Sequence, residues 1–192
     1  MRARPGGTAH RSAIAIRAAV VLGLCGLAVA ATTPRAAAAA GNATLLVAPI
    51  DFFDTAADQR PAIVADQHRW LAAADTRLRH DLDAASNLHV VESKAARQGL
   101  AEITADYAHP TSCPSCLLAA AKTAGAAYAI APELHRISNL ILYMRVIVYR
   151  VGAAGPVFEQ TNEVKADNRT MILRATNSMA QAIETAIPQS SP

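Results

Sequence analysis

A chain of 192 residues is long enough for one ordinary domain with a buried core, and it is too short for two domains once an export leader is subtracted. Its formal charge of +3 depends on arginines in the first 40 residues, because without them 13 basic residues face 15 acidic ones. This balance and an aromatic content of 4% exclude the strongly basic, aromatic surface of a nucleic-acid-binding protein.

The first 40 residues have the three-part pattern of a cleavable secretion signal: arginines without acids, an apolar run over Ala18–Ala31, and small residues. The run holds about 14 residues, fewer than the roughly 18 that a helix needs to span a bilayer. We predict cleavage after Ala40, with Ala30 as the alternative site. The mature domain, residues 41–192, is then periplasmic or secreted and has no transmembrane anchor.

The first half of the mature chain predicts a strand, a helix, a strand and two further helices. Thr44–Ile50 is a short apolar run that ends at an acidic residue, which favours a buried strand. Ala62–Ala85 repeats apolar residues every three or four positions, as an amphipathic helix does. Leu88–Val91 predicts the second strand. Lys94–Tyr107 and Ser115–Gly125 predict the next two helices, the second of which ends at a glycine suited to a helix C-terminus.

The second half predicts three consecutive strands and a last helix. The strands are Tyr128–Leu134, Ile137–Val151 and Val157–Lys165, and the last of them is polar enough for a sheet edge. The middle strand has a mixed odd face and an apolar even face, which consists of Leu140, Leu142, Met144, Val146 and Val148. Asn168 or Thr170 caps the final helix.

These elements define an α/β (α+β) fold class in a single domain. Their order, β-α-β-α-α-β-β-β-α, begins with two βαβ-like units and continues with a meander of strands. It predicts a mixed sheet of about five strands with helices mainly on one face.

Four short motifs give the chain a resemblance to a known family. They are Asp51-Phe52 after the first strand, Cys113-Pro114-Ser115-Cys116 at the start of a helix, Gly125-Ala126 before a strand, and Ser138-Asn139-Leu140-Ile141-Leu142. With them the chain resembles a family of secreted bacterial proteins described only as a domain of unknown function. The family's Gly-Asn-Thr-Asp segment reads Asp167-Asn168-Arg169-Thr170 here, and no tryptophan follows it. The resemblance implies no activity.

The pair Cys113 and Cys116 is the most chemically reactive motif. Cys25 lies in the leader and is removed with it, so these two thiols remain together in an oxidising compartment. They can form a local structural disulfide, which we favour, or an active dithiol whose pKa the helix N-terminus lowers. A third interpretation adds His109 to make a metal site, although structural zinc needs a fourth ligand.

Asp51, Asp54 and Asn139 are candidate contacts for a ligand or partner. The two aspartates follow the first predicted strand, and open α/β sheets bind ligands beyond the carboxyl ends of their strands. Turn formation and helix capping explain the same two side chains. Asn139 lies on the mixed face of the long strand. No set of residues indicates catalysis, and we expect no cofactor.

The sequence therefore indicates a non-catalytic accessory protein, periplasmic or secreted, that docks a protein partner or a small ligand. The element order also resembles the N-terminal domain of the TolB-like periplasmic proteins, which implies docking of partners, although fold alone does not establish function. The alternative is a thiol-disulfide or metal-handling protein that uses Cys113 and Cys116.

Overall fold

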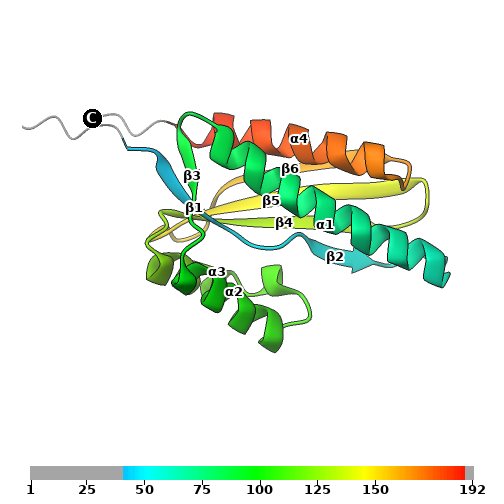
Figure 1. Cartoon of the computed structure of the whole chain (residues 1–192), viewed down its shortest axis with the longest axis horizontal. Coiled ribbons are helices and arrows are strands. Elements are labelled where there is room, and N and C mark those ends of the chain that lie inside the picture. The colour runs from blue at the N-terminus through cyan, green and yellow to red at the C-terminus, as the bar shows by residue number, and fades with distance from the viewer. Residues whose placement is uncertain (1–40, 189–192) are drawn as a thin grey trace, which may run out of the picture. The chain divides into compact units, whose positions relative to one another are not determined.

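Six strands form one mixed sheet in the computed structural model, which describes residues 41–188; the predicted secretion signal lies outside the described residues. The strands are β1 (Ala43–Val47), β2 (Asp51–Asp54), β3 (Leu88–Val90), β4 (Tyr128–Arg136), β5 (Ile141–Arg150) and β6 (Pro156–Lys165). Strands β3, β1, β4, β5 and β6 lie side by side in that order (Figure 1). β1 is parallel to β3 and β4, whereas β4, β5 and β6 form an antiparallel meander.

β2 is the strand that the sequence did not predict. β4 is nine residues long, and β1 pairs only with its first part, Tyr128–Ile130. The remaining edge of β4, Glu133–Arg136, pairs with β2 in parallel. Buried backbone groups need hydrogen-bond partners. The edge of β4 therefore pairs with two short strands, β1 and β2, which lie end to end along it. The other elements follow in the predicted order, and the α/β class with a mixed sheet is confirmed.

The helical segments are α1 (Pro61–Ala84), α2 (Lys94–Asp106), the 3₁₀ turn η1 (Pro110–Ser112), α3 (Pro114–Ala124) and α4 (Arg169–Ala186). Asn168, one of the two predicted caps, begins α4 by accepting a hydrogen bond from the backbone N of Met171 at 3.0 Å. Gly125 ends α3 with a φ of 77°, a left-handed conformation that glycine adopts without steric cost. Both helix ends therefore follow from the sequence.

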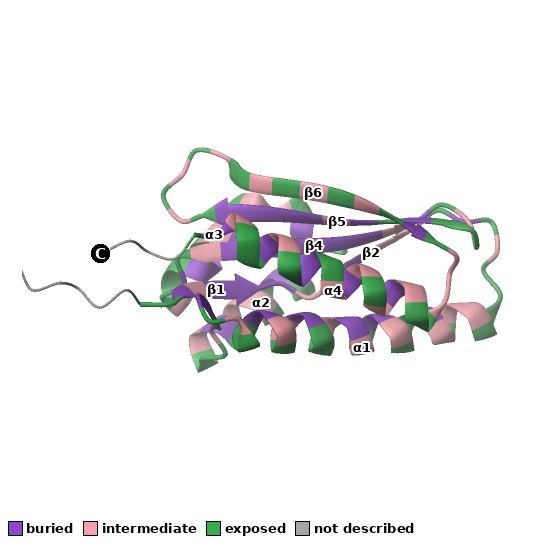
Figure 2. Ribbon diagram, turned by 90° about the horizontal axis from the view of Figure 1, so that it is seen from above, coloured by how far each residue is buried: buried purple, intermediate pink, exposed green. Residues whose placement is uncertain are grey.

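The two long helices, α1 and α4, cover one face of the sheet, while α2 and α3 pack at one end of the opposite face (Figure 1). The even positions of β5 are buried beneath α1 and α4, as predicted, from Leu142 to Val148. Leu140 departs from that prediction: it is 73% exposed, because it lies in the turn before β5 and not in the strand. In Figure 2 the central strands β4 and β5 carry mostly the colour of buried residues. None of the helices within residues 41–188 is long and apolar enough to cross a membrane.

Candidate functional site

Helices α2 and α3 leave part of their sheet face uncovered. Along β5 this face is buried beneath the helices, but toward the β4–β5 turn Ile141 and Tyr143 are exposed. Tyr143 pairs with His135 of β4, and His135 pairs with Phe53 of β2. Paired residues lie on the same face of a sheet, so these side chains form one surface. We call it the open face; it consists of Phe53, His135, Ile141 and Tyr143, together with Ile137 and Leu140 in the adjoining β4–β5 turn.

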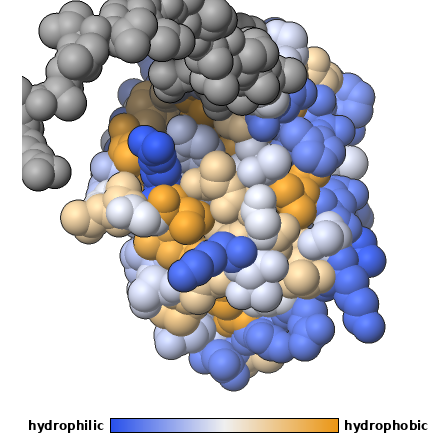
Figure 3. Space-filling view, turned by 90° about the vertical axis from the view of Figure 1, so that its left-hand side faces the viewer, coloured by the Kyte–Doolittle hydropathy of each residue, from blue (hydrophilic) through white to orange (hydrophobic). Residues whose placement is uncertain are grey.

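Exposed apolar side chains gather on the open face. Residues 41–188 include six large hydrophobic residues that are exposed to solvent. Four of them lie at the β4–β5 hairpin, with exposed fractions of 48% for Ile137, 73% for Leu140, 42% for Ile141 and 38% for Tyr143. Figure 3 views the end of the domain where β1 begins, and there apolar side chains form small patches between hydrophilic ones. The hairpin lies at the other end of the sheet (Figure 1). Exposed apolar groups that cluster mark interaction surfaces more often than scattered ones do.

Three stacked rings border the hairpin. The Phe53 ring lies between the imidazoles of His109 and His135, with ring centroids 4.0 Å and 4.5 Å apart and nearly parallel planes. The three residues come from η1's flanking loop, β2 and β4, so the stack connects segments that are distant in sequence. Stacked rings add packing energy beyond their buried area and hold one another in place.

Asp51 holds one member of that stack, His109, in position. Its carboxylate is buried and accepts hydrogen bonds from Nδ1 of His109 at 2.8 Å and from the hydroxyl of Thr111 at 2.8 Å. The backbone N of Thr111 donates to the same carboxylate at 3.2 Å. All the contacts of Asp51 are therefore internal, and it holds η1 against β2.

A row of charged side chains runs beside the rings. Glu133 is buried and contacts Nε2 of His135 at 2.8 Å and the Arg145 guanidinium at 3.3 Å. Arg145 also pairs with Glu159 of β6 at 2.8 Å. Burial disfavours the charged guanidinium, but the hydrogen bond that Arg145 donates to Glu159 and the charge of Glu133 outweigh this effect and raise the pKa of Arg145. The ion pairs of this row connect β4, β5 and β6.

Arg136, the last residue of β4, is buried on the opposite face of the sheet. Its guanidinium has no exposed surface and pairs with Asp54 at 2.9 Å and with Asp167 at 3.0 Å. It also donates to the side-chain oxygen of Asn139 and to the carbonyl of Asp58. A buried cation needs several such partners, because desolvation of the charge is costly.

Asn139 completes the network at the hairpin. Its amide donates to the carboxylate of Asp58 at 3.0 Å. Hydrogen bonds from Arg60 and then from Asn139 hold the pKa of the Asp58 carboxyl well below its ordinary value. The structure thus brings Asp54 and Asn139 together around Arg136, while Asp51 lies on the other face of the sheet. The three candidate contacts do not share one surface, and each is engaged internally.

Cys113 and Cys116 form a disulfide, so the favoured pairing is present in the structure. Cys113 precedes α3 and Cys116 lies in its first turn, where it packs against the smaller core. The sulfurs bond to each other and do not offer the two thiolates of the metal interpretation, and His109 is held by Asp51 and Phe53. Within residues 41–188 no group of three or more potential ligands is placed to hold a metal ion.

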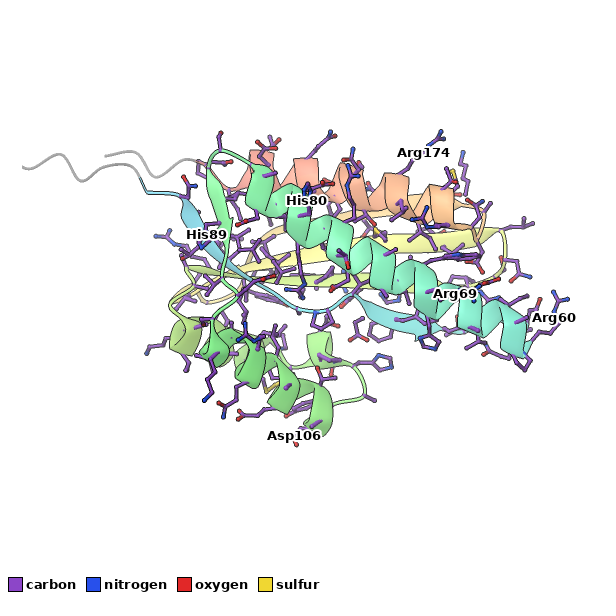
Figure 4. The ribbon with its side chains drawn as sticks, viewed as in Figure 1. Arg60, Arg69, His80, His89, Asp106 and Arg174 are labelled. Atoms are coloured by element: carbon purple, nitrogen blue, oxygen red, sulfur yellow. A yellow bond between two sulfur atoms is a disulfide. The ribbon has the colours of Figure 1, made fainter. Side chains whose placement is uncertain are left out.

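The other histidines of residues 41–188 are separate from this site. His80 on α1 and His89 on β3, both labelled in Figure 4, contact Asp81 and Asp83. His68 meets the edge of Phe52. The functional residues that the sequence left unmarked are Phe53, His135, Arg136 and Tyr143. The alternation of the long strand was the available signal for Tyr143, since it lies on the mixed face.

Residues 43–183 match the family model DUF3280, whose description is "Protein of unknown function (DUF2380)", and the chain belongs to this family. The resemblance inferred from its motifs to a domain of unknown function is confirmed. A comparison with curated proteins gave no match.

Several solved structures are similar to the chain. The LpoB C-terminal domain from Salmonella enterica is 16% identical over 65% of this chain and 84% of that one, with a TM-score of 0.44. A PelC dodecamer from Paraburkholderia phytofirmans is 12% identical over 78% and 92%, with a TM-score of 0.45. TolB from Acinetobacter baumannii is 12% identical over 76% of this chain and 28% of that one, with a TM-score of 0.42.

Proposed function

We propose that this protein is a non-catalytic accessory protein of the bacterial cell envelope, exported by its N-terminal signal, and that a protein partner docks on the open face. The observation that carries the proposal is the gathering of exposed apolar side chains at the β4–β5 hairpin, led by Leu140 at 73% exposure. Removal of apolar surface from water is the dominant favourable term in protein association.

The shape of the surface favours a protein over a small ligand. The grooves between α1 and α4, between α1 and β3, and between α2 and α3 contain no side chain of the open face. Small molecules bind in concave pockets, whereas protein interfaces place an apolar centre inside a polar rim. Arg145 and Glu159 provide such a rim beside Tyr143. The expected partner presents apolar side chains surrounded by charged ones.

The internal contacts of the predicted site residues support this function in another way. Asp51 holds the ring stack, and Asp54 and Asn139 hold Arg136 at the base of the hairpin. A surface fixed before binding loses less conformational entropy when the partner arrives. We therefore assign these three residues to the shaping of the open face, and direct contact to Leu140 and Tyr143.

The test is capture of the partner from envelope extracts by the exported protein and by two matched variants. The double variant Leu140→Ser/Tyr143→Ala removes the exposed centre of the open face. Tyr107→Ala removes a tyrosine of similar exposure, 40%, at the end of α2. We expect a stoichiometric partner with the wild type and with Tyr107→Ala, and at least about tenfold less with the double variant, since hot-spot side chains dominate binding. Equal capture by all three proteins would refute the proposal.

Thiol-disulfide exchange is the second candidate function, and the observation that favours it is the disulfide at the start of α3 with Cys113 only partly buried. A helix N-terminus stabilises a thiolate, which is the attacking species in exchange. Equilibration with a glutathione buffer and an insulin-reduction assay test it. Catalytic turnover, and loss of captured proteins on Cys113→Ser/Cys116→Ser, would establish exchange; a pair that stays oxidised without turnover is structural.

A further inference from the structure

We propose that the outer edge of β6 is a dimerisation edge, at which two copies of this chain pair β6 with β6 in antiparallel orientation and form one continuous sheet. β6 is ten residues long and pairs only with β5 among the strands in residues 41–188. Figure 2 shows it at the margin of the sheet, with exposed and intermediate residues alternating. An open edge of this length is a template for another strand.

The hydrogen bonds of the sheet identify the backbone groups on that edge. The Ile130 carbonyl of β4 accepts from the backbone N of Ala48, so even residues of β4 face β1 and odd residues face β5. Odd residues of β4 pair with odd residues of β5, and even residues of β5 pair with even residues of β6. The backbone N–H and C=O groups of successive residues point toward opposite edges of a strand. The odd residues of β6 therefore direct these groups away from β5. They are Val157, Glu159, Thr161, Glu163 and Lys165.

The charges on β6 favour one register of long overlap for a second copy. All three charged side chains, Glu159, Glu163 and Lys165, lie at odd positions and so on one face. A dimer axis at Asn162 places Glu159 opposite Lys165 of the second copy, twice. An axis at Thr161 instead places Glu159 opposite Glu163, and an axis at Glu163 places that residue opposite itself. Opposite charges stabilise a cross-strand pair and like charges destabilise it. The register centred on Asn162 exchanges about eight backbone hydrogen bonds.

The opposite face of the edge has room for the second copy. A depression of about 480 Å³ lies beside β6, and its walls are Val157, Phe158, Gln160, Gln181, Ala182, Thr185 and Ala186. In the proposed register, the C-terminal half of β6 and the start of α4 from the second copy meet this depression. The small side chains of Ala182 and Ala186 permit close approach of the two α4 helices, which pack at roughly 8–10 Å between axes.

The test measures the mass of the purified protein in solution by sedimentation at rising concentration. The wild type is expected to dimerise. Lys165→Glu and Glu159→Lys each place two like-charged pairs at the interface, so each alone should weaken the dimer by at least about tenfold. Mixed together, the two variants place opposite charges at both positions and should restore a heterodimer. Lys94→Glu, an equal charge change on α2, should leave dimerisation unchanged.

Thr161→Pro tests the backbone pairing separately. It removes an outward N–H while the ladder to β5 uses even residues, so the monomer should keep its circular dichroism spectrum and lose the dimer. A wild type that stays monomeric at about 100 μM, where even weak dimers form, would overturn the proposal. So would a dimer that survives Thr161→Pro, or variants that do not recover the dimer on mixing.

Discussion

Arg136 carries a full positive charge in a site with no exposed side-chain surface. Its two carboxylate partners are themselves poorly exposed, 14% for Asp54 and 4% for Asp167. Asp54 comes from β2 and Asp167 from the segment before α4. One guanidinium therefore links an early and a late segment of the chain to β4. Gln67 of α1 donates to the same carboxylate of Asp167 at 2.6 Å and brings a third element to the site. This side chain links the sheet to its helical layer near the hairpin.

Replacement of Arg136 by Met should therefore be among the most damaging single changes. It leaves the Asp167 carboxylate buried without its cation, and breaking a buried ion pair typically costs about 3–5 kcal/mol of unfolding free energy. Urea denaturation followed by circular dichroism measures the loss. Arg60→Met is the control, because Arg60 is 73% exposed and its pairing with Asp58 is open to solvent. Equal midpoints for the two variants would show that the buried network contributes nothing to stability.

The sequence alone could not identify Arg136 or the ring stack. An arginine at the end of a strand resembles an ordinary solvent-facing charge, and its burial depends on Asp54 and Asp167, which only the fold brings close. Phe53, His109 and His135 are likewise distant in sequence. By contrast, the helix caps at Asn168 and Gly125 depend on neighbouring residues, and the local sequence was sufficient to predict them.

The two faces of β5 provide a test of how the strand is oriented. Val146 is buried beneath α1 and α4, while the neighbouring Arg145 is 35% exposed on the other face. Val146→Asp should cost several kcal/mol, because an unpaired carboxylate enters the core. Arg145→Ser should cost less, since Glu159 is 46% exposed and the buried Glu133 keeps its contact with His135. Thermal melts compare them, and equal melting temperatures would mean that the faces are reversed.

The periodic spacing of apolar residues was enough to predict the helices and the long strands, because each of these elements buries residues at regular intervals. It missed β2, whose four residues Asp51–Asp54 are too few to show a period. Its pairing depends on the free length of β4. The exposure of Leu140 has the same origin, since the position at which β5 begins is set by the turn after Arg136 and not by the apolar pattern.

The predicted export of the chain can be tested directly by mass spectrometry. Because the apolar run Ala18–Ala31 is short and is followed by small residues, the exported protein should begin at Gly41 or Ala31 and leave the cell with the periplasmic fraction. Intact-mass measurement after osmotic shock gives the first residue. A mass that includes Met1, or recovery only with membranes, would contradict the predicted signal.

The arrangement of two strands end to end on β4 has a consequence for the order of assembly. Among the strands of residues 41–188, β2 pairs only with β4, and β4 follows it in the chain only after three α-helices. A chain that emerges from its N-terminus therefore carries Phe52 and Phe53 unpaired until β4 arrives. Long-range pairing of this kind slows folding and prolongs exposure of apolar segments. Until β4 is available, the Phe-Phe segment is an exposed apolar site of the kind that chaperones bind.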